Sequence, residues 1–107
     1  MAISDKQIAD IKKYDKSVDM KLATALYRRL AGVLARRDAA LVSFTDSKEV
    51  SRVRNGFIKK TLGVADRKKA DAALDAVHAK MKKDRTKSRL TAYYLLAQEL
   101  RKANKVK

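Results

Sequence analysis

Apolar residues recur every three or four positions along most of the chain, which is the spacing of one face of an α-helix. At the amino terminus, Ser4 and Gln7 form the pattern of a capping box, in which each side chain accepts the backbone N–H of the other residue. A short apolar face follows at helical spacing: Ile8, Ile11 and Tyr14. The sequence therefore predicts a short first helix that begins just after Ser4.

A second, longer helix is predicted to run to about Arg36, with Asp15 and Ser17 as candidate caps. Its apolar positions share one face: Leu22, Leu26, Leu30, Val33 and Leu34, with Ala23 and Tyr27 beside them. Gly32 falls opposite this face, so we expect it to be exposed. Residues 38–45 then predict a short turn that carries three apolar side chains into the core: Leu41, Val42 and Phe44.

A third helix is predicted from Asp46, which forms another amino-terminal capping pattern with Glu49. The Asn55-Gly56 pair within it is a strong short-range signal for a β-hairpin. The apolar positions around that pair nevertheless keep a helical period: Val50, Val53, Phe57 and Thr61. Because the flanking residues do not alternate as strands would, a helix is preferred here, with Gly63 at its carboxyl end.

Asp66 opens a fourth predicted helix, whose apolar residues lie on one face: Ala70, Leu74, Val77 and Met81. A fifth helix is predicted from about Thr86 to Arg101, with an apolar face of its own: Leu90, Tyr93, Tyr94, Ala97 and Leu100. Residues 102–107 are expected to form a frayed basic tail, which leaves about 4–101 ordered. The expected fold is all-α, a single compact bundle of four to five helices with short loops, in one domain over residues 1–107.

The composition supports this fold and adds a strong positive charge. The chain has 107 residues, 46% of them hydrophobic, with no proline and three glycines, a mixture that favours helices over a turn-rich β fold. Its 27 Lys and Arg residues outnumber 12 Asp and Glu residues, for a net charge of +15 at pH 7. Most of the excess lies in residues 51–107, with +12, against +3 in residues 1–50. This asymmetry favours a polyanionic partner.

The sequence offers little for catalysis or for a cofactor. With one histidine and no cysteine, we expect neither a metal site nor another cofactor. His78 lies at the edge of an apolar face, where we expect it to be half-buried and structural. Asp71 and Asp75 are one helical turn apart and are expected to pair with Lys68 or to neutralise nearby lysines. With no nucleophile–base pair and no glycine loop for phosphates, we predict a non-enzymatic protein.

The same sequence argues against a membrane location. No apolar run approaches the length of a transmembrane helix, and the amino terminus lacks the apolar segment of a signal peptide. The apolar faces of the basic helices are needed for the core of the domain. We therefore expect a cytoplasmic protein that does not bind membranes.

Residues 57–74 resemble a helix-turn-helix DNA-binding unit, with Leu62-Gly63-Val64 between two predicted helices. That unit requires a small residue four positions before the glycine and a buried β-branched residue six positions after it. Lys59 and Lys69 occupy these two positions, and burying both charges would cost several kcal/mol. These two positions argue against a helix-turn-helix unit, which stays a minor alternative.

The most basic segment is residues 80–89, where Asp84 is the one acidic residue. Three of its cations fall in the last turn of the fourth predicted helix, where the helix dipole favours positive charge: Lys80, Lys82 and Lys83. Three others fall in the first turn of the fifth, where positive charge is unfavourable: Arg85, Lys87 and Arg89. Ion pairs with acids of other helices, or an anion bound at this helix amino terminus, would explain them. Tyr93 and Tyr94 are assigned to the core rather than to base stacking.

Several stretches resemble a bacterial family of small proteins classed as domain of unknown function 2853. They are KYD at 13–15, RRD at 36–38, LVS at 41–43, RVRNGFIKK with LG at 52–63, and MKKDRTKSRLTAYYLLA at 81–97. The resemblance spans about residues 11–100 and is most specific in the last stretch. It implies a compact helical domain, and it brings no activity, cofactor or functional residues. The present chain is more basic than the family pattern, so an argument from charge applies to this chain and not to the whole family.

These observations predict an accessory binding protein that contacts a nucleic-acid backbone with little sequence specificity. The candidate polyanion-binding residues are Arg85, Lys87, Arg89, Lys82, Lys83, Arg52, Lys59 and Lys60. The alternative is a protein-interaction or structural module, whose basic face meets an acidic protein partner or only aids solubility.

Overall fold

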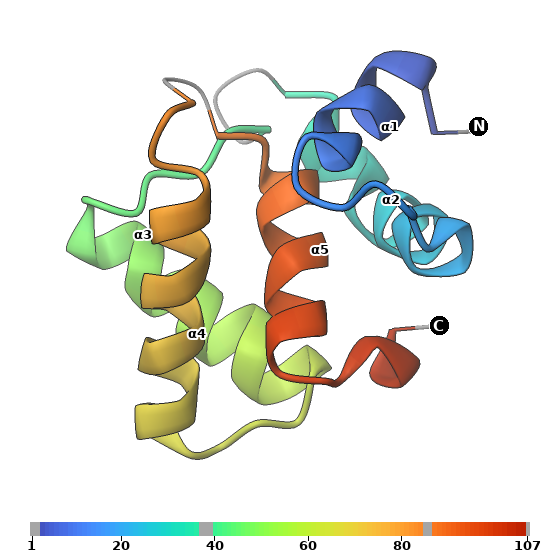
Figure 1. The fold of residues 1–107 in the computed structure, drawn as a ribbon. Helices are drawn as coiled ribbons and strands as arrows, with labels where there is room; N and C mark the ends of the chain where they lie inside the picture. The colour runs from blue at the N-terminus through green and yellow to red at the C-terminus, as the bar shows by residue number, and fades with distance from the viewer. Residues whose placement is uncertain (1–2, 37–39, 85–86, 107) are drawn as a thin grey trace.

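Seven helical segments, joined by short loops, make up the described part of the chain. The computed structural model describes residues 3–36, 40–84 and 87–106. The segments are α1 (Asp5–Lys12), α2 (Met20–Leu34), α3 (Ser47–Arg52), the π-helix η1 (Val53–Thr61), α4 (Arg67–Lys80), α5 (Arg89–Glu99) and the 3-10 helix η2 (Ala103–Lys105). No β-strand forms among the described residues, and the all-α prediction is confirmed (Figure 1).

Helix α5 lies at the centre of the fold, with α4 on one side and α1 and α2 on the other (Figure 1). It is buried without interruption from Leu90 to Ala97. A helix surrounded by other elements is apolar all round, so the one-sided apolar face predicted for it is only part of its buried surface. The predicted start near Thr86 is too early, because α5 begins at Arg89 after the N-cap Ser88.

Side-chain caps begin α1, α3 and α4 as the sequence predicts. Ser4 Oγ accepts the Gln7 N–H at 3.2 Å, and Gln7 Oε1 accepts the Ser4 N–H at 3.0 Å, which completes the capping box. Asp46 and Asp66 accept backbone N–H groups in the first turns of α3 and α4. These local signals therefore placed three helix starts correctly.

The start of α2 differs from the prediction because Asp15 is used elsewhere. Its carboxylate accepts hydrogen bonds from Tyr94 Oη at 2.6 Å and from Gln98 Nε2 at 2.9 Å, both on α5. The cap of α2 is Asp19, rather than Asp15 or Ser17. The Asp19 N–H also donates to Tyr94 Oη at 2.8 Å, so one fully buried tyrosine joins the segment before α2 to α5.

The apolar face of α2 is buried over its first three turns, as predicted: Leu22, Ala23, Leu26 and Leu30. Tyr27 and Leu34 are partly buried against this core. Gly32 is exposed, which confirms the prediction. Val33 is exposed as well, so the buried face ends earlier than the sequence pattern indicated.

The Asn55-Gly56 pair lies within a helix, as predicted, but that helix is a π-helix and not an α-helix. In a π-helix each N–H binds the carbonyl five residues earlier, as the Leu62 N–H does with Phe57 O at 2.9 Å. The buried residues follow this longer spacing in two pairs: Val53 with Ile58, and Phe57 with Leu62. Thr61, which the α-helical period aligned with Val53 and Phe57, is only partly buried.

Two helical segments end at a residue with positive φ. Gly63 has a φ of 73°, which confirms its predicted role at the end of η1. Arg101 has a φ of 55° after α5, where the Lys102 N–H closes the helix by donating to Ala97 O at 2.9 Å. Arginine therefore occupies a position that favours glycine.

The segment between α2 and α3 contacts the start of α5 through an antiparallel bridge between Leu41 and Ser88. Val42 is buried and Phe44 is partly buried, but Leu41 faces the solvent. The prediction that all three apolar side chains enter the core is therefore wrong for Leu41. Successive side chains in extended backbone point to opposite sides, so Leu41 and Val42 do not share a face.

The chain after α5 packs back onto the domain. The short helix η2 contacts α5, and Val106 is buried. This arrangement differs from the frayed tail expected over residues 102–107, because Val106 is an apolar residue that the core accommodates. Lys107 lies outside the described residues.

Candidate anion-binding surface

Arg89, the first residue of α5, has its guanidinium group inside the molecule. Its Nη2 pairs with Glu49 of α3 and donates to Leu41 O at 3.2 Å, while Nη1 donates to Tyr93 Oη at 2.9 Å. Both charged side chains are largely buried, with 12% of Arg89 and 13% of Glu49 exposed. Of the two explanations for its charge, an ion pair with an acid of another helix applies to Arg89.

The backbone at this helix end is also engaged. The Arg89 N–H donates to Ala40 O at 2.8 Å, and Ser88 Oγ accepts the Thr91 N–H. An anion at the amino terminus of α5 would need N–H groups of this kind. Two of them already have partners within the protein, so the amino terminus of α5 is a poor anion site.

The other candidates near α5 lie before the helix rather than in its first turn. Lys87 Nζ donates to Asp84 O at 2.7 Å. Lys82 and Lys83 are exposed in the turn that follows α4. Arg85 lies outside the described residues.

Asp84, at the centre of the basic segment, is a contact between distant parts of the chain. Its carboxylate accepts a hydrogen bond from Tyr14 Oη and lies 3.6 Å from Lys13 Nζ. Burial, together with the hydrogen bond to Asp84, raises the pKa of Tyr14 above its usual range. This carboxylate therefore helps to hold the end of α1 against the turn before α5.

The remaining candidates follow the α3–η1 segment. Arg52 Nη1 lies 3.8 Å from Glu49 Oε2, which places it beside the Arg89 ion pair. Lys59 and Lys60 are exposed near the carboxyl end of η1. In Figure 1 that end of η1 and the carboxyl end of α4 lie at different ends of the molecule. The described candidates therefore do not form one patch.

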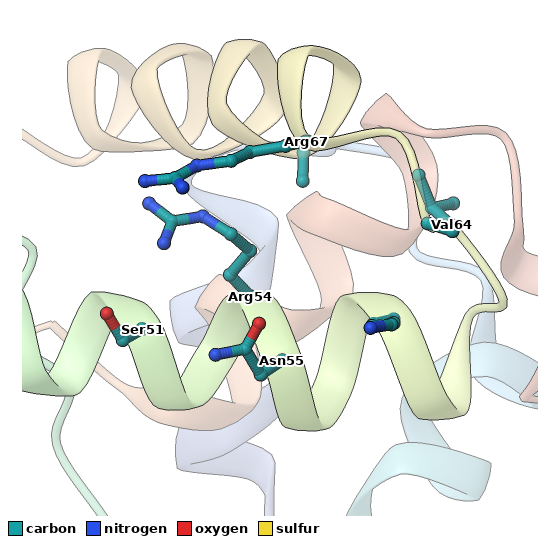
Figure 2. Close-up of a pocket in the computed structure, with 8 residues that line it drawn as sticks. Ser51, Arg54, Asn55, Val64 and Arg67 are labelled. Carbon is teal, nitrogen blue, oxygen red and sulfur yellow. The ribbon is translucent and has the colours of Figure 1, made fainter.

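A cationic cluster that the sequence analysis did not predict lies between η1 and α4. Asp71 Oδ1 accepts a hydrogen bond from Arg54 Nε at 2.7 Å, and Asp71 Oδ2 lies 3.6 Å from Arg67 Nε. Both arginines line a cleft between these helices (Figure 2). The cleft has a volume of about 360 Å³, and Lys59 also lines it. Of the seven predicted candidates that the structure describes, Lys59 is the one that lines this cleft.

Part of this cluster could have been found from the sequence. Arg67 and Asp71 are four residues apart on one helix, a spacing that favours ion pairs. Asp71 was expected to pair with Lys68 or to neutralise nearby lysines, whereas its observed partners are Arg67 and Arg54. The pair with Arg54 depends on how η1 packs against α4, and no local pattern indicates that contact.

The aromatic residues considered for function lie in or against the core. Tyr93 stacks on Phe57 with ring centroids 4.1 Å apart, and Tyr93 and Tyr94 are both buried, as expected for core residues. Burial raises the pKa of Tyr94 to about 12, and the hydrogen bond to Asp15 adds to that rise. The ring of His78 stacks on Phe44 at 5.3 Å, and its partial burial was predicted.

Residues 3–36, 40–84 and 87–106 contain no group of three or more His, Cys, Asp or Glu side chains that could hold a metal ion. Within the same residues, no helix is both long enough and apolar enough to cross a membrane.

Residues 6–104 match the model of a family described as "Protein of unknown function (DUF2853)". The chain belongs to the DUF2853 family. The match covers nearly the whole chain and confirms the resemblance read from the sequence. No curated protein matches the sequence. Because the family description names no activity, the surface of the chain is the basis for inferring its function.

Proposed function

We propose that this member of the DUF2853 family is a non-enzymatic binding protein whose basic surface holds the phosphate backbone of a nucleic acid. The observation that carries the proposal is that acidic and basic side chains occupy different places in the fold. Most carboxylates of the described residues are engaged in contacts within the fold, and most cations face the solvent.

The carboxylates have three structural roles. Some cap helices: Asp19, Asp46 and Asp66. Others accept hydrogen bonds from side-chain hydroxyl groups of distant residues: Asp10, Asp15 and Asp84. A third group pairs with Lys or Arg side chains: Glu49, Asp71 and Glu99. These contacts hold the carboxylates at helix ends and at partners within the fold, so few of them are left to pair with the surface lysines and arginines.

The exposed surface is correspondingly basic. Among the described residues, twenty Lys and Arg residues are exposed, against five acidic residues: Asp5, Asp46, Asp66, Asp75 and Glu99. A surface with this excess attracts polyanions over a distance of about a Debye length and accelerates their binding. Contacts from Lys and Arg to phosphates supply most of the affinity of sequence-independent binding.

Fluorescence anisotropy with a labelled duplex and a labelled single strand, each at two salt concentrations, tests the proposal. If about five phosphates are neutralised, log K should fall with log salt with a slope of about −4 to −5 for a duplex. The control is a duplex at high salt, where the electrostatic contribution to binding is largely lost. Binding weaker than about 100 µM to both nucleic acids at low salt would overturn the proposal, since non-specific binding is ordinarily tighter than that.

An acidic protein could use the same basic surface, and a second experiment separates the two kinds of partner. The tagged protein is recovered from a lysate with and without nuclease treatment. Our proposal expects the partners to be nucleic acid and proteins that nuclease removes. A stoichiometric acidic protein that remains after nuclease, together with no binding in the anisotropy assay, would favour the protein-interaction alternative.

A further inference from the structure

The cleft between η1 and α4 brings three cations and two neutral hydrogen-bonding side chains to one place. Its volume is about 360 Å³, and its polar lining comes from Ser51, Arg54, Asn55, Lys59 and Arg67 (Figure 2). This volume is near the lower end of the range for ligand pockets, which suits a small charged group.

The positive charge of this cleft is only partly compensated. Among the described residues, Asp71 is the one carboxylate paired with the arginines of this cleft, so three positive charges meet one negative charge. A second arginine-lined hollow, of about 310 Å³, lies beside Glu49, but Asp46 also lines it. An anion there would compete with Glu49 for Arg89. Of these two hollows, the η1–α4 cleft therefore has the larger uncompensated positive charge.

Asp71 holds both guanidinium groups by their Nε atoms and leaves their ends accessible. Arg54 Nε donates to Asp71 Oδ1 at 2.7 Å, and Arg67 Nε lies 3.6 Å from Oδ2. Within the described part of the chain, neither arginine forms a hydrogen bond through its terminal Nη atoms. Figure 2 shows the two guanidinium groups next to each other in the gap between the helices. Such groups form the planar fork that binds two oxygens of a phosphate.

The backbone that presents these side chains is unusual. η1 is a π-helix of nine residues, whereas π-helical geometry mostly occurs as single-turn bulges and frequently at functional sites. It buries Val53 and Ile58 while Arg54 reaches Asp71 on α4. Asn55 and Lys59 of the same π-helix also line the cleft. The π-helical segment thus supplies most of the polar lining.

We propose that this cleft binds a single phosphate group, with Arg54 and Arg67 donating to its oxygens and Lys59 supplying a third positive charge. The inference rests on the proposed function for the source of the group, which is a phosphodiester of a bound nucleic-acid strand. A contact of this kind fixes the position of a strand without reading its sequence.

A pair of matched double variants tests the inference. Lys59→Gln with Arg67→Gln removes two exposed cations from the cleft. Lys60→Gln with Lys68→Gln removes two exposed cations from neighbouring positions on the same two elements, outside the cleft. Both variants have the same net charge, and their melting temperatures check that both are folded. We expect the cleft variant to weaken single-strand binding about tenfold more than the control and to reduce the salt slope by about one phosphate contact.

A titration with inorganic phosphate at constant ionic strength, followed by two-dimensional amide NMR, provides an independent readout. Chloride at the same ionic strength is the control. We expect phosphate-specific shifts at residues 51–55 and 64–67 in the wild-type protein, and none there in the cleft variant.

The two arms separate failure of the cleft from failure of the proposed function. Equal loss of strand binding in the two double variants, with no phosphate shifts in the cleft, would overturn the cleft site while nucleic-acid binding stands. Shifts confined to the cleft, in a protein that binds neither duplex nor single strand, would support the phosphate site and overturn the proposed function. Phosphate shifts spread evenly over the basic surface would also overturn the cleft site.

Discussion

Replacing Arg89 with methionine should destabilise the fold by about 3 kcal/mol, near the lower end of the cost of breaking a buried ion pair. The change leaves Glu49 largely buried, with 13% of its side chain exposed, and its remaining cation is Arg52 at 3.8 Å. Because 79% of the Arg52 side chain is exposed, it compensates Glu49 only weakly. Methionine keeps most of the apolar packing against Tyr93, so the loss reports mainly on the polar contacts.

Urea unfolding at pH 7, followed by circular dichroism, measures this cost. For a domain of this size, about 3 kcal/mol corresponds to a fall in melting temperature of roughly 10–20 °C. Arg52→Met is the matched control, because it removes an arginine from the other side of Glu49 and should cost less than about 0.5 kcal/mol. Adding Glu49→Gln to Arg89→Met should recover part of the loss, since the unpaired buried charge is then removed.

The opposite pattern would refute this reasoning. If Arg89→Met unfolds at the same urea concentration as Arg52→Met, and nucleic-acid affinity falls tenfold more than in that control, Arg89 is a contact residue and not a structural one. The ion pair with Glu49 would then make no measurable contribution to the free energy of unfolding.

Three further substitutions test other contacts. Tyr94→Phe should cost about 1–3 kcal/mol at pH 7, because the buried hydroxyl bonds both Asp15 and the Asp19 N–H. Hydrogen bonds from Tyr94 and Gln98 lower the pKa of Asp15 from its usual 3.8. The Asp15 carboxylate therefore stabilises the fold above pH 3.8, and this stabilisation is lost as the pH falls through the lower pKa of the folded state. The Tyr94→Phe stability profile should thus be flatter below pH 5, and a parallel profile would contradict this origin. Gly63→Ala should cost about 1–2 kcal/mol through its φ of 73° alone, since no atom of the described residues, apart from Gly63 and its chain neighbours, lies within 4 Å of an added Cβ. An unchanged urea midpoint would contradict that cost. Arg101→Gly should raise the free energy of unfolding by at most about 1 kcal/mol, because glycine relieves the strain of a φ of 55°. Arg101→Ala removes the charge but keeps the strain, so it should not raise the free energy of unfolding.

The parts of the fold that the sequence predicted are those with local causes. The capping box of Ser4 and the caps at Asp46 and Asp66 depend on residues within one helical turn, and all three are confirmed. The positive φ of Gly63 has the same local character. Where a residue had two possible uses, local rules were insufficient: Asp15 was a reasonable cap for α2 but binds Tyr94 instead.

The candidate site was harder to predict because its contacts join elements that are distant in sequence. Arg89 meets Glu49 across 40 positions, and Arg54 meets Asp71 across 17. The register of η1 adds a second difficulty, because an α-helical period cannot indicate which residues of a π-helix face α4. The long-range ion pairs and the π-helical register of η1 together decide which arginines lie inside the molecule and which line a cleft.

The distribution of charge along the sequence consequently differs from its distribution in the folded structure. Asp10, Asp15 and Glu49 all belong to the less basic first half of the chain, yet each binds a side chain of α5 in the basic second half. Glu49 brings negative charge to Arg89, at the end of the segment that looked most uncompensated in the sequence, and Asp10 and Asp15 bring it to the rest of α5. Among the described residues, three of the remaining cations line the η1–α4 cleft, where Asp71 is the carboxylate paired with the two arginines. The phosphate titration is therefore the experiment that most directly tests where the excess charge acts.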